Sequence, residues 1–167
     1  KLDITNSICE DSVNFIRSKG VIDYIKIDNS LSDGLDSDFS NLIIENMNIT
    51  NSKNDCADFS FGNYKINNAR MSNCGDKAIS VGEQSIMKVN NLFVVKSKTG
   101  IASKDSSKTE ILKSDIYEVN ECYAAYKKKQ EFEGGYISVN ESKCLNNKKN
   151  NLIDGYSKII INKNNEL

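Results

Sequence analysis

The same pattern of residues returns every 22 positions along this chain. Asp11, Asp33 and Asp55 mark the first three copies, and Lys77 and Thr99 continue the count. The residues that follow each of these positions are in turn small, apolar, polar and mixed in character. A fixed period of about 20 to 50 residues is typical of solenoids, in which each repeat forms one coil stacked on the next. The 167 residues therefore predict a single solenoid domain of about seven coils.

The second half of the unit indicates how each coil is built. Apolar and polar residues alternate over short runs, which favours strands, and the unit is too short for a pair of helices. Asn29, Asn51 and Asn73 form a further column with the same period. Asn tolerates the left-handed backbone of tight turns, so this column predicts a ladder of corners. We therefore expect an all-β parallel β-helix with strands that include residues 43–49, 66–71, 86–93 and 136–139.

Composition limits the classes of partner. The chain is 27% charged and 38% hydrophobic with a formal net charge of -1, so no basic surplus points to nucleic acid. Its apolar runs are far too short to predict a membrane span. Both ends read as ordinary strands without capping units, from which we expect a fragment of a longer polypeptide with additional domains. The first residue is Lys1, so the absence of a visible leader leaves the compartment open, with an extracellular or cell-surface location favoured.

The chain has five cysteines and no histidine. None of the cysteines has the CxxC spacing of a zinc or redox site. Cys122 and Cys144 are one period apart and can stack closely enough for a disulfide, but small half-buried residues in turn columns are the favoured interpretation for all five. The lack of histidine excludes Ser-His-Asp, Cys-His and His-zinc chemistry.

The repeat becomes irregular after Ser107. Residues 126–135 predict an inserted lateral loop, and residues 146–151 predict a second one. Insertions in solenoids often lie on the face that binds, and aromatic rings suit sugars or cations. Tyr126, Lys128 and Phe132 are therefore candidate ligand-binding residues, with a simple solvated edge as the alternative.

Stacked aspartates give the strongest indication of a site. The period places Asp33 beside Asp55 and Asp36 beside Asp58, where like charges need compensation. Bound Ca²⁺ or another ligand can supply it, and so can a hydrogen-bonded ladder of turns; acid-base catalysis is a third interpretation. These four aspartates are therefore candidate ligand-binding residues and candidate Ca²⁺ ligands. Further carboxylates on the same edge are Asp11, Asp38 and Asp76.

The segments 32–36, 54–57 and 75–82 resemble the right-handed parallel β-helix repeats of the pectin-lyase-like superfamily, and the resemblance implies that handedness and a bacterial source. Asp33, Asp36 and Asp55 match aspartates of the polygalacturonase pattern. Asn54 replaces one required acid, however, and Lys77 stands where those enzymes have histidine. The resemblance therefore implies the scaffold of a polysaccharide hydrolase without its complete water-activating pair.

Lyases of the same superfamily use Lys or Arg to remove a proton next to a carboxylate that Ca²⁺ or a positive side chain neutralises. The segment 101–104 resembles a lyase strand that ends in its base, which makes Lys104 a candidate catalytic residue; Lys77 and Lys128 are alternatives. Two functions follow from the sequence. The first is a non-catalytic module of a bacterial surface protein that binds glycan or acts as a rigid spacer. The second is a Ca²⁺-assisted lyase or epimerase of a uronate polymer.

Overall fold

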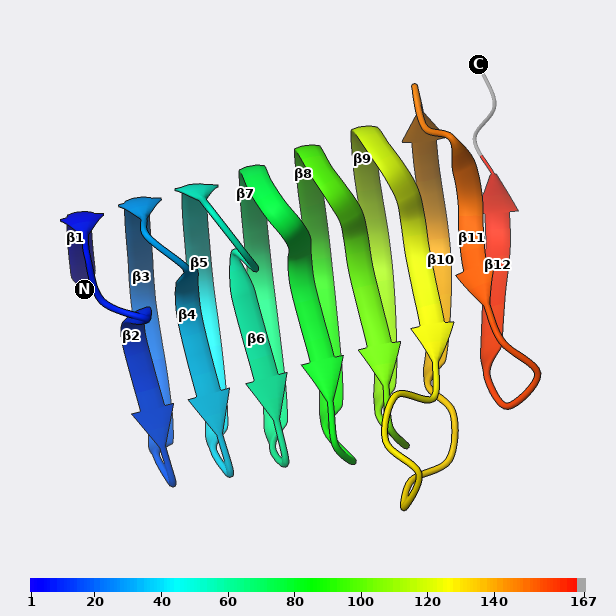
Figure 1. Ribbon diagram of the computed structural model, residues 1–167, viewed down its shortest axis with the longest axis horizontal. Coiled ribbons are helices and arrows are strands. Elements are labelled where there is room, and N and C mark those ends of the chain that lie inside the picture. Colours follow the sequence, from blue (N-terminus) through cyan, green and yellow to red (C-terminus); the bar gives the residue numbers. More distant parts are fainter. Residues whose placement is uncertain (165–167) are drawn as a thin grey trace.

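The computed structural model describes residues 1–164 and shows a parallel β-solenoid of about seven turns (Figure 1). Every regular element of this part of the chain is a strand. The predicted all-β parallel β-helix is thus confirmed, and each of the four predicted strand segments lies within a strand. The strands are β1 (Leu2–Ser7), β2 (Asp11–Ile16), β3 (Lys19–Ser30), β4 (Asp33–Asp38), β5 (Asn41–Ser52), β6 (Ala57–Ser60), β7 (Asn63–Gly82), β8 (Ile86–Lys104), β9 (Lys108–Tyr126), β10 (Tyr136–Leu145), β11 (Lys149–Ile153) and β12 (Lys158–Asn164).

Strands of successive coils pair in parallel and form two rows. One row runs in the order β1, β3, β5, β7, β8, β9, β10 and β12. The second row begins with β2, β4 and β6, continues through the C-terminal parts of β7, β8 and β9, and ends at β11. Each coil therefore contributes one strand segment to each row, and equivalent side chains of neighbouring coils lie side by side.

The register shows where the period changes. Lys77 pairs with Thr99 and Thr99 with Glu121, so the 22-residue spacing persists well beyond Ser107, and the expected break there is wrong. The change comes later, because Lys108 pairs with Tyr136 across an inserted segment. A smaller slip occurs earlier, where Asn63 pairs with Ile86.

The predicted asparagine ladder forms one corner of the solenoid. Asn29, Asn51 and Asn73 have φ between 55° and 64°, in the left-handed region that Asn tolerates. Asn29 Nδ2 donates to Asn6 Oδ1 at 2.7 Å, and Asn73 Nδ2 donates to Asn51 Oδ1 at 2.9 Å. In the next coil this corner falls on Lys96 with φ of 59° and not on Val95, because the preceding slip adds one residue.

Apolar side chains fill the inside of the coils. Ile49, Ile66 and Phe59 are fully buried. The hydroxyl of the buried Tyr123 is hydrogen-bonded to Ser114 of its own coil and to Ser142 of the next one. Alternation along each strand sends one set of side chains into this core and the other set outward. The core thereby fixes which polar residues face outward in each row.

Four cysteines form two disulfides, Cys56 with Cys74 and Cys122 with Cys144. Their Cα atoms lie 5.4 Å and 6.2 Å apart. The favoured interpretation of the cysteines as small half-buried residues that fill turn columns is therefore wrong for these four. The Cys122–Cys144 bond does form, but the two residues are not equivalents one period apart: Cys144 pairs with Ile116, and Lys149 and Asn151 pair with the neighbours of Cys122. Cys9 is the remaining cysteine and is exposed.

Two connections interrupt the regular coils. Residues 127–135 lie outside strands between β9 and β10 and project sideways from the solenoid (Figure 1). The second expected loop is shorter than the 146–151 predicted, because Lys149–Ile153 form β11 and pair with β9. The described residues contain no helix of the length and hydropathy needed to cross a membrane.

Candidate functional site

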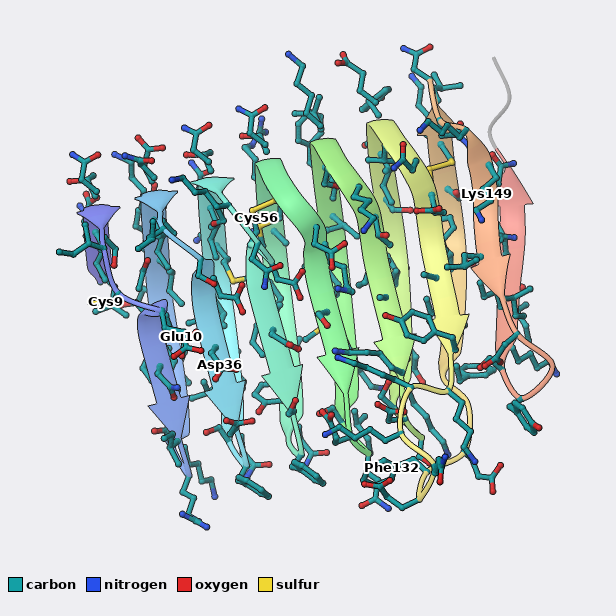
Figure 2. All side chains as sticks on the ribbon, viewed as in Figure 1. Cys9, Glu10, Asp36, Cys56, Phe132 and Lys149 are labelled. Carbon is teal, nitrogen blue, oxygen red and sulfur yellow. A yellow bond between two sulfur atoms is a disulfide. The ribbon has the colours of Figure 1, made fainter. Side chains whose placement is uncertain are left out.

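The second row of strands presents three columns of outward residues, which we call the charged face. The first column lies where the second-row segment of each coil begins, and the other two columns occupy alternate positions further along it. Asp36, in the second column, is labelled in Figure 2. The columns thus bring together residues from six coils. They consist of Asp11, Asp33, Asp55, Lys77, Thr99 and Glu121; Asn14, Asp36, Asp58, Ser80, Ala102 and Ala124; and Ile16, Asp38, Ser60, Gly82, Lys104 and Tyr126.

The first column is a hydrogen-bonded ladder. Asp33 Oδ1 accepts from the backbone N–H of Asp55 at 2.9 Å and from Asn54 Nδ2 at 2.7 Å. Asp55 Oδ1 accepts from the backbone N–H of Lys77 at 2.8 Å and from Lys77 Nζ at 3.4 Å. Each carboxylate therefore fastens its own coil to the next one. This geometry favours the turn-ladder interpretation for Asp33 and Asp55.

The second and third columns hold carboxylates with fewer partners. Asp36 accepts one hydrogen bond, from Asn14 Nδ2 at 3.2 Å, and Oδ1 of Asp58 has no hydrogen-bond partner. Burial, together with the neighbouring charges of Asp38, Asp11 and Asp58, raises the pKa of Asp36 to about 7. Burial and the charge of Asp58 also raise the pKa of Asp38. Like charges are thus brought together here, with Lys104 near Asp58 as their ion-pair partner among the described residues.

The raised pKa of Asp36 gives a prediction for stability. The folded state keeps the Asp36 proton up to about pH 7, whereas the unfolded chain loses it near 3.8, so stability falls as pH rises between these values. We expect Asp36→Asn to stabilise the protein by about 1 to 2 kcal/mol at about pH 8, after allowance for solvent screening. The melting temperature should then rise by roughly 2 to 8 °C at that pH and stay unchanged near pH 4.

Asp28→Asn provides the matched control for this measurement. Hydrogen bonds from Thr50 Oγ1 at 2.6 Å and Asn51 Nδ2 at 2.8 Å lower the pKa of Asp28. A lowered carboxyl pKa stabilises the fold above the unfolded value, so this variant should lower the melting temperature at about pH 8. If Asp36→Asn also lowered it there, the stacked carboxylates would not be a source of strain.

Lys104 and Lys77 occupy different environments on the charged face. Lys104 is only 4% exposed, and its Nζ lies 3.7 Å from Asp58 Oδ2, beyond hydrogen-bonding distance. Gly82 makes room for it, because a Cβ atom at that position would meet Lys104 Cε at 3.2 Å. Lys77 contacts Asp55 and Asp76. Burial acts to lower the pKa of Lys77, but these two carboxylates outweigh it and raise the pKa far above its usual range.

These environments bear on the two candidate bases. A general base must release its proton near neutral pH, which a lysine with a raised pKa does poorly. Lys77 is therefore a cation that holds two carboxylates. Lys104 lies beside Tyr126 in the third column, because these residues pair across β8 and β9. Burial raises the pKa of Tyr126, so its hydroxyl stays protonated.

The lateral loop of residues 127–135 is fixed beside the charged face. Asp105 Oδ1 accepts from the backbone N–H groups of Lys128 and Lys129 at 2.7 and 2.8 Å. Lys129 Nζ lies 2.6 Å from Glu83 Oε1, and Phe132 packs edge-on against Phe61 with ring centroids 6.2 Å apart. Phe132 therefore anchors the loop, and Lys128 contributes its backbone while its side chain is exposed.

The face of Phe61 toward the preceding coil is also covered. Phe39 stacks on it with centroids 4.7 Å apart, and Arg17 lies over Phe39. Both phenylalanines have φ of 51°, which is unusual for bulky side chains. Their stack forms the corner that follows the third column and supports the loop through Phe132. The sequence did not single out either residue, although their spacing of 22 was visible.

Four aspartates were expected to bind Ca²⁺. Within residues 1–164, no group of three or more Cys, Asp or Glu side chains has the arrangement of a metal site. Oxygens of Asp33 and Asp55 already accept backbone hydrogen bonds in the ladder. Asp36 and Asp58, which are neighbours in the second column, retain the freer oxygens.

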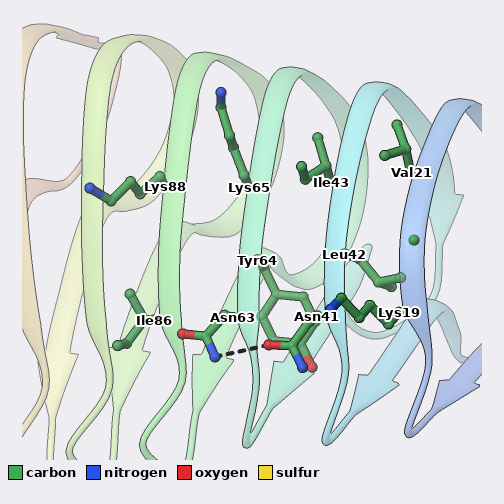
Figure 3. Close-up of a pocket in the computed structure, with 11 residues that line it drawn as sticks. Lys19, Val21, Asn41, Leu42, Ile43, Asn63, Tyr64, Lys65, Ile86 and Lys88 are labelled. Carbon is green, nitrogen blue, oxygen red and sulfur yellow. Dashed lines mark hydrogen bonds between the residues drawn. The ribbon is translucent and has the colours of Figure 1, made fainter.

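An apolar groove with a volume of about 460 Å³ lies on β3, β5, β7 and β8, in the first row of strands and outside the charged face (Figure 3). Its walls include the exposed apolar side chains of Val21, Ile43 and Ile86, with Lys65 and Lys88 on its rim. This groove was not expected from the sequence. The sequence feature that marks it is the presence of apolar residues at outward positions of strands.

Comparison with models of protein families, with curated proteins and with solved structures finds no match.

Proposed function

We propose that the chain is a non-catalytic glycan-binding module of a larger, surface-associated bacterial protein. The group of acceptors formed by Asp36 and Asp38 on one coil and Asp58 on the next carries this proposal. Carboxylates accept hydrogen bonds and donate none, so they suit a ligand rich in hydroxyl groups. Neighbouring coils lie about 4.8 Å apart, so acceptors on two adjacent coils can contact successive groups of a linear polymer.

Two further observations support the proposal. Two disulfides favour an oxidising compartment such as the cell exterior. The lysine at the position of the polygalacturonase histidine is held by Asp55 and Asp76, so it supplies charge and not a base. The solenoid itself remains consistent with the pectin-lyase-like superfamily, whose members act on polysaccharides. If the module binds no ligand, its proposed role is that of a rigid spacer.

Binding to a glycan panel tests the proposal. We expect the protein to retain at least one class of oligosaccharide, and Asp38→Ala with Asp58→Ala to weaken that binding about tenfold, which corresponds to about 1.4 kcal/mol. Ile43→Ser, in the apolar groove, is the control and should leave binding unchanged. Loss of binding in the control alone would place the ligand in the apolar groove. Absence of binding to every glycan would leave the spacer role.

The second candidate function is a lyase or epimerase of a uronate polymer. It is favoured by Lys104, which is nearly enclosed, lacks a hydrogen-bonded partner among the described residues and lies beside Tyr126. In this proposal Lys104 removes the proton next to a uronate carboxylate, and Ca²⁺ held by Asp36 and Asp58 neutralises that carboxylate. Release of unsaturated uronate that disappears in Lys104→Met would support catalysis; no release with or without Ca²⁺ would count against it.

A further inference from the structure

We propose that the glycan bound by the charged face is an amino sugar polymer with free, protonated amines. This inference rests on the proposed glycan-binding function and specifies the class of sugar. It places the ammonium groups on the second and third columns at Asp36, Asp38 and Asp58. The neighbouring sugar hydroxyls lie toward Ser80 and Lys104.

The distribution of charge supports a cationic ligand. The N-terminal coils of the charged face carry Asp11, Asp36, Asp38 and Asp58, and the first three have no ion-pair partner within the described chain. Asp58 has only Lys104, at 3.7 Å. The other nearby cations are engaged elsewhere, Lys77 by the first column and its neighbour, and Lys129 by Glu83. A bound ammonium would supply the missing positive charge, whereas a uronate would add a further negative one.

Buried polar atoms without partners form an independent observation. Ser80 is completely buried, yet its Oγ has no hydrogen-bond partner. It pairs with Asp58 across β6 and β7, while Ile79 and Val81 on either side point into the core, so Ser80 belongs to the outward column. Ser80 pairs with Ala102 of the next coil, and Lys104 lies two residues after Ala102. The side chain of Lys104 is 5% exposed and has no hydrogen bond. Buried polar groups are normally satisfied, so this cluster lacks a hydrogen-bonding partner.

The cluster combines acceptors and donors in a way that fits a sugar better than a simple cation. Asp58 Oδ1 offers a free acceptor, Ser80 Oγ can donate and accept, and Lys104 Nζ donates. A polyamine or basic peptide would satisfy the carboxylates and leave the ammonium of Lys104 facing another cation. An amino sugar presents an ammonium to the carboxylates and hydroxyl oxygens to Lys104.

Titration calorimetry with short oligosaccharides tests the inference. The probes are unacetylated glucosamine oligomers, N-acetylglucosamine oligomers of the same length, oligogalacturonate and spermidine, under conditions in which the free amines are protonated. We expect the glucosamine oligomers to bind at least tenfold more tightly than each of the other three. Asp58→Asn, which keeps the shape and removes one charge, should weaken their binding about tenfold. Glu110→Gln removes one charge outside the charged face and should leave it unchanged.

Each other result has a defined meaning. Equal or tighter binding of the N-acetylated or galacturonate oligomers would overturn the amino sugar inference and keep the proposed glycan function. Spermidine binding as tightly as the glucosamine oligomers would overturn the inference in favour of a general cation surface. Failure of all three sugars to bind would overturn the amino sugar inference, and the proposed glycan function would fall only if the wider glycan panel also showed no binding. Circular dichroism of each variant confirms that a lost affinity does not come from unfolding.

Discussion

Removal of the Cys122–Cys144 disulfide is expected to destabilise the protein by about 3 kcal/mol, because the bond closes a loop of roughly 20 residues in the unfolded chain. For a domain of this length, the melting temperature should fall by roughly 6 to 12 °C. The bond joins β9 to β10 across the lateral loop, where the repeat is interrupted. Its loss therefore frees the two coils at the point where the regular register gives them least support.

Thermal unfolding of a Cys122→Ser, Cys144→Ser double variant measures this effect. Cys9→Ser is the control, since Cys9 is exposed and outside both disulfides, and it should leave the melting temperature unchanged. Reducing agent should lower the melting temperature of the unmodified protein further than the double variant does, because it also opens the Cys56–Cys74 bond. A double variant as stable as the control would contradict the assigned role of the bond.

The repeat made the fold predictable because a solenoid copies local geometry. A 22-residue period, alternating strands and an Asn column at one corner all required the same stacked coils. The corner φ values of Asn29, Asn51 and Asn73 confirm that step. The period did not predict the one-residue slip that pairs Asn63 with Ile86. A single added residue at a corner leaves the strand patterns on both sides intact.

The candidate site was predictable only in part. The period brought Asp36 beside Asp58, and the structure confirms that pairing. The period could not predict that Asp33 and Asp55 differ from this pair by accepting hydrogen bonds from backbone N–H groups of the next coil. That difference depends on side-chain direction at the start of a strand, which residue type alone does not determine. The burial of Lys104 was also hidden, because it requires the empty position at Gly82 in the preceding coil.

The lateral loop illustrates a different limit. Its aromatic residues suggested a surface for sugars, yet Phe132 packs against Phe61 and anchors the loop. Asp105 fixes the start of the same loop through two backbone N–H groups. These partners are distant in sequence and have no shared motif, so only the packed coils bring them together. The loop therefore borders the charged face as a fixed wall.

Truncation of the buried ladder carboxylate, Asp55→Ala, is expected to destabilise the protein by about 2 to 3 kcal/mol, because it leaves the Lys77 backbone N–H without an acceptor. The melting temperature should fall by roughly 4 to 12 °C. Asp55→Asn keeps an oxygen acceptor and Asp76 still holds the Lys77 ammonium, so most of the stability should return. Asp38→Ala should have little effect, since the Asp38 carboxylate has no ion-pair partner among the described residues. If Asp38→Ala were the more destabilising change, the first column would not be the ladder that joins the coils, and the third column could not be a surface left free for ligand.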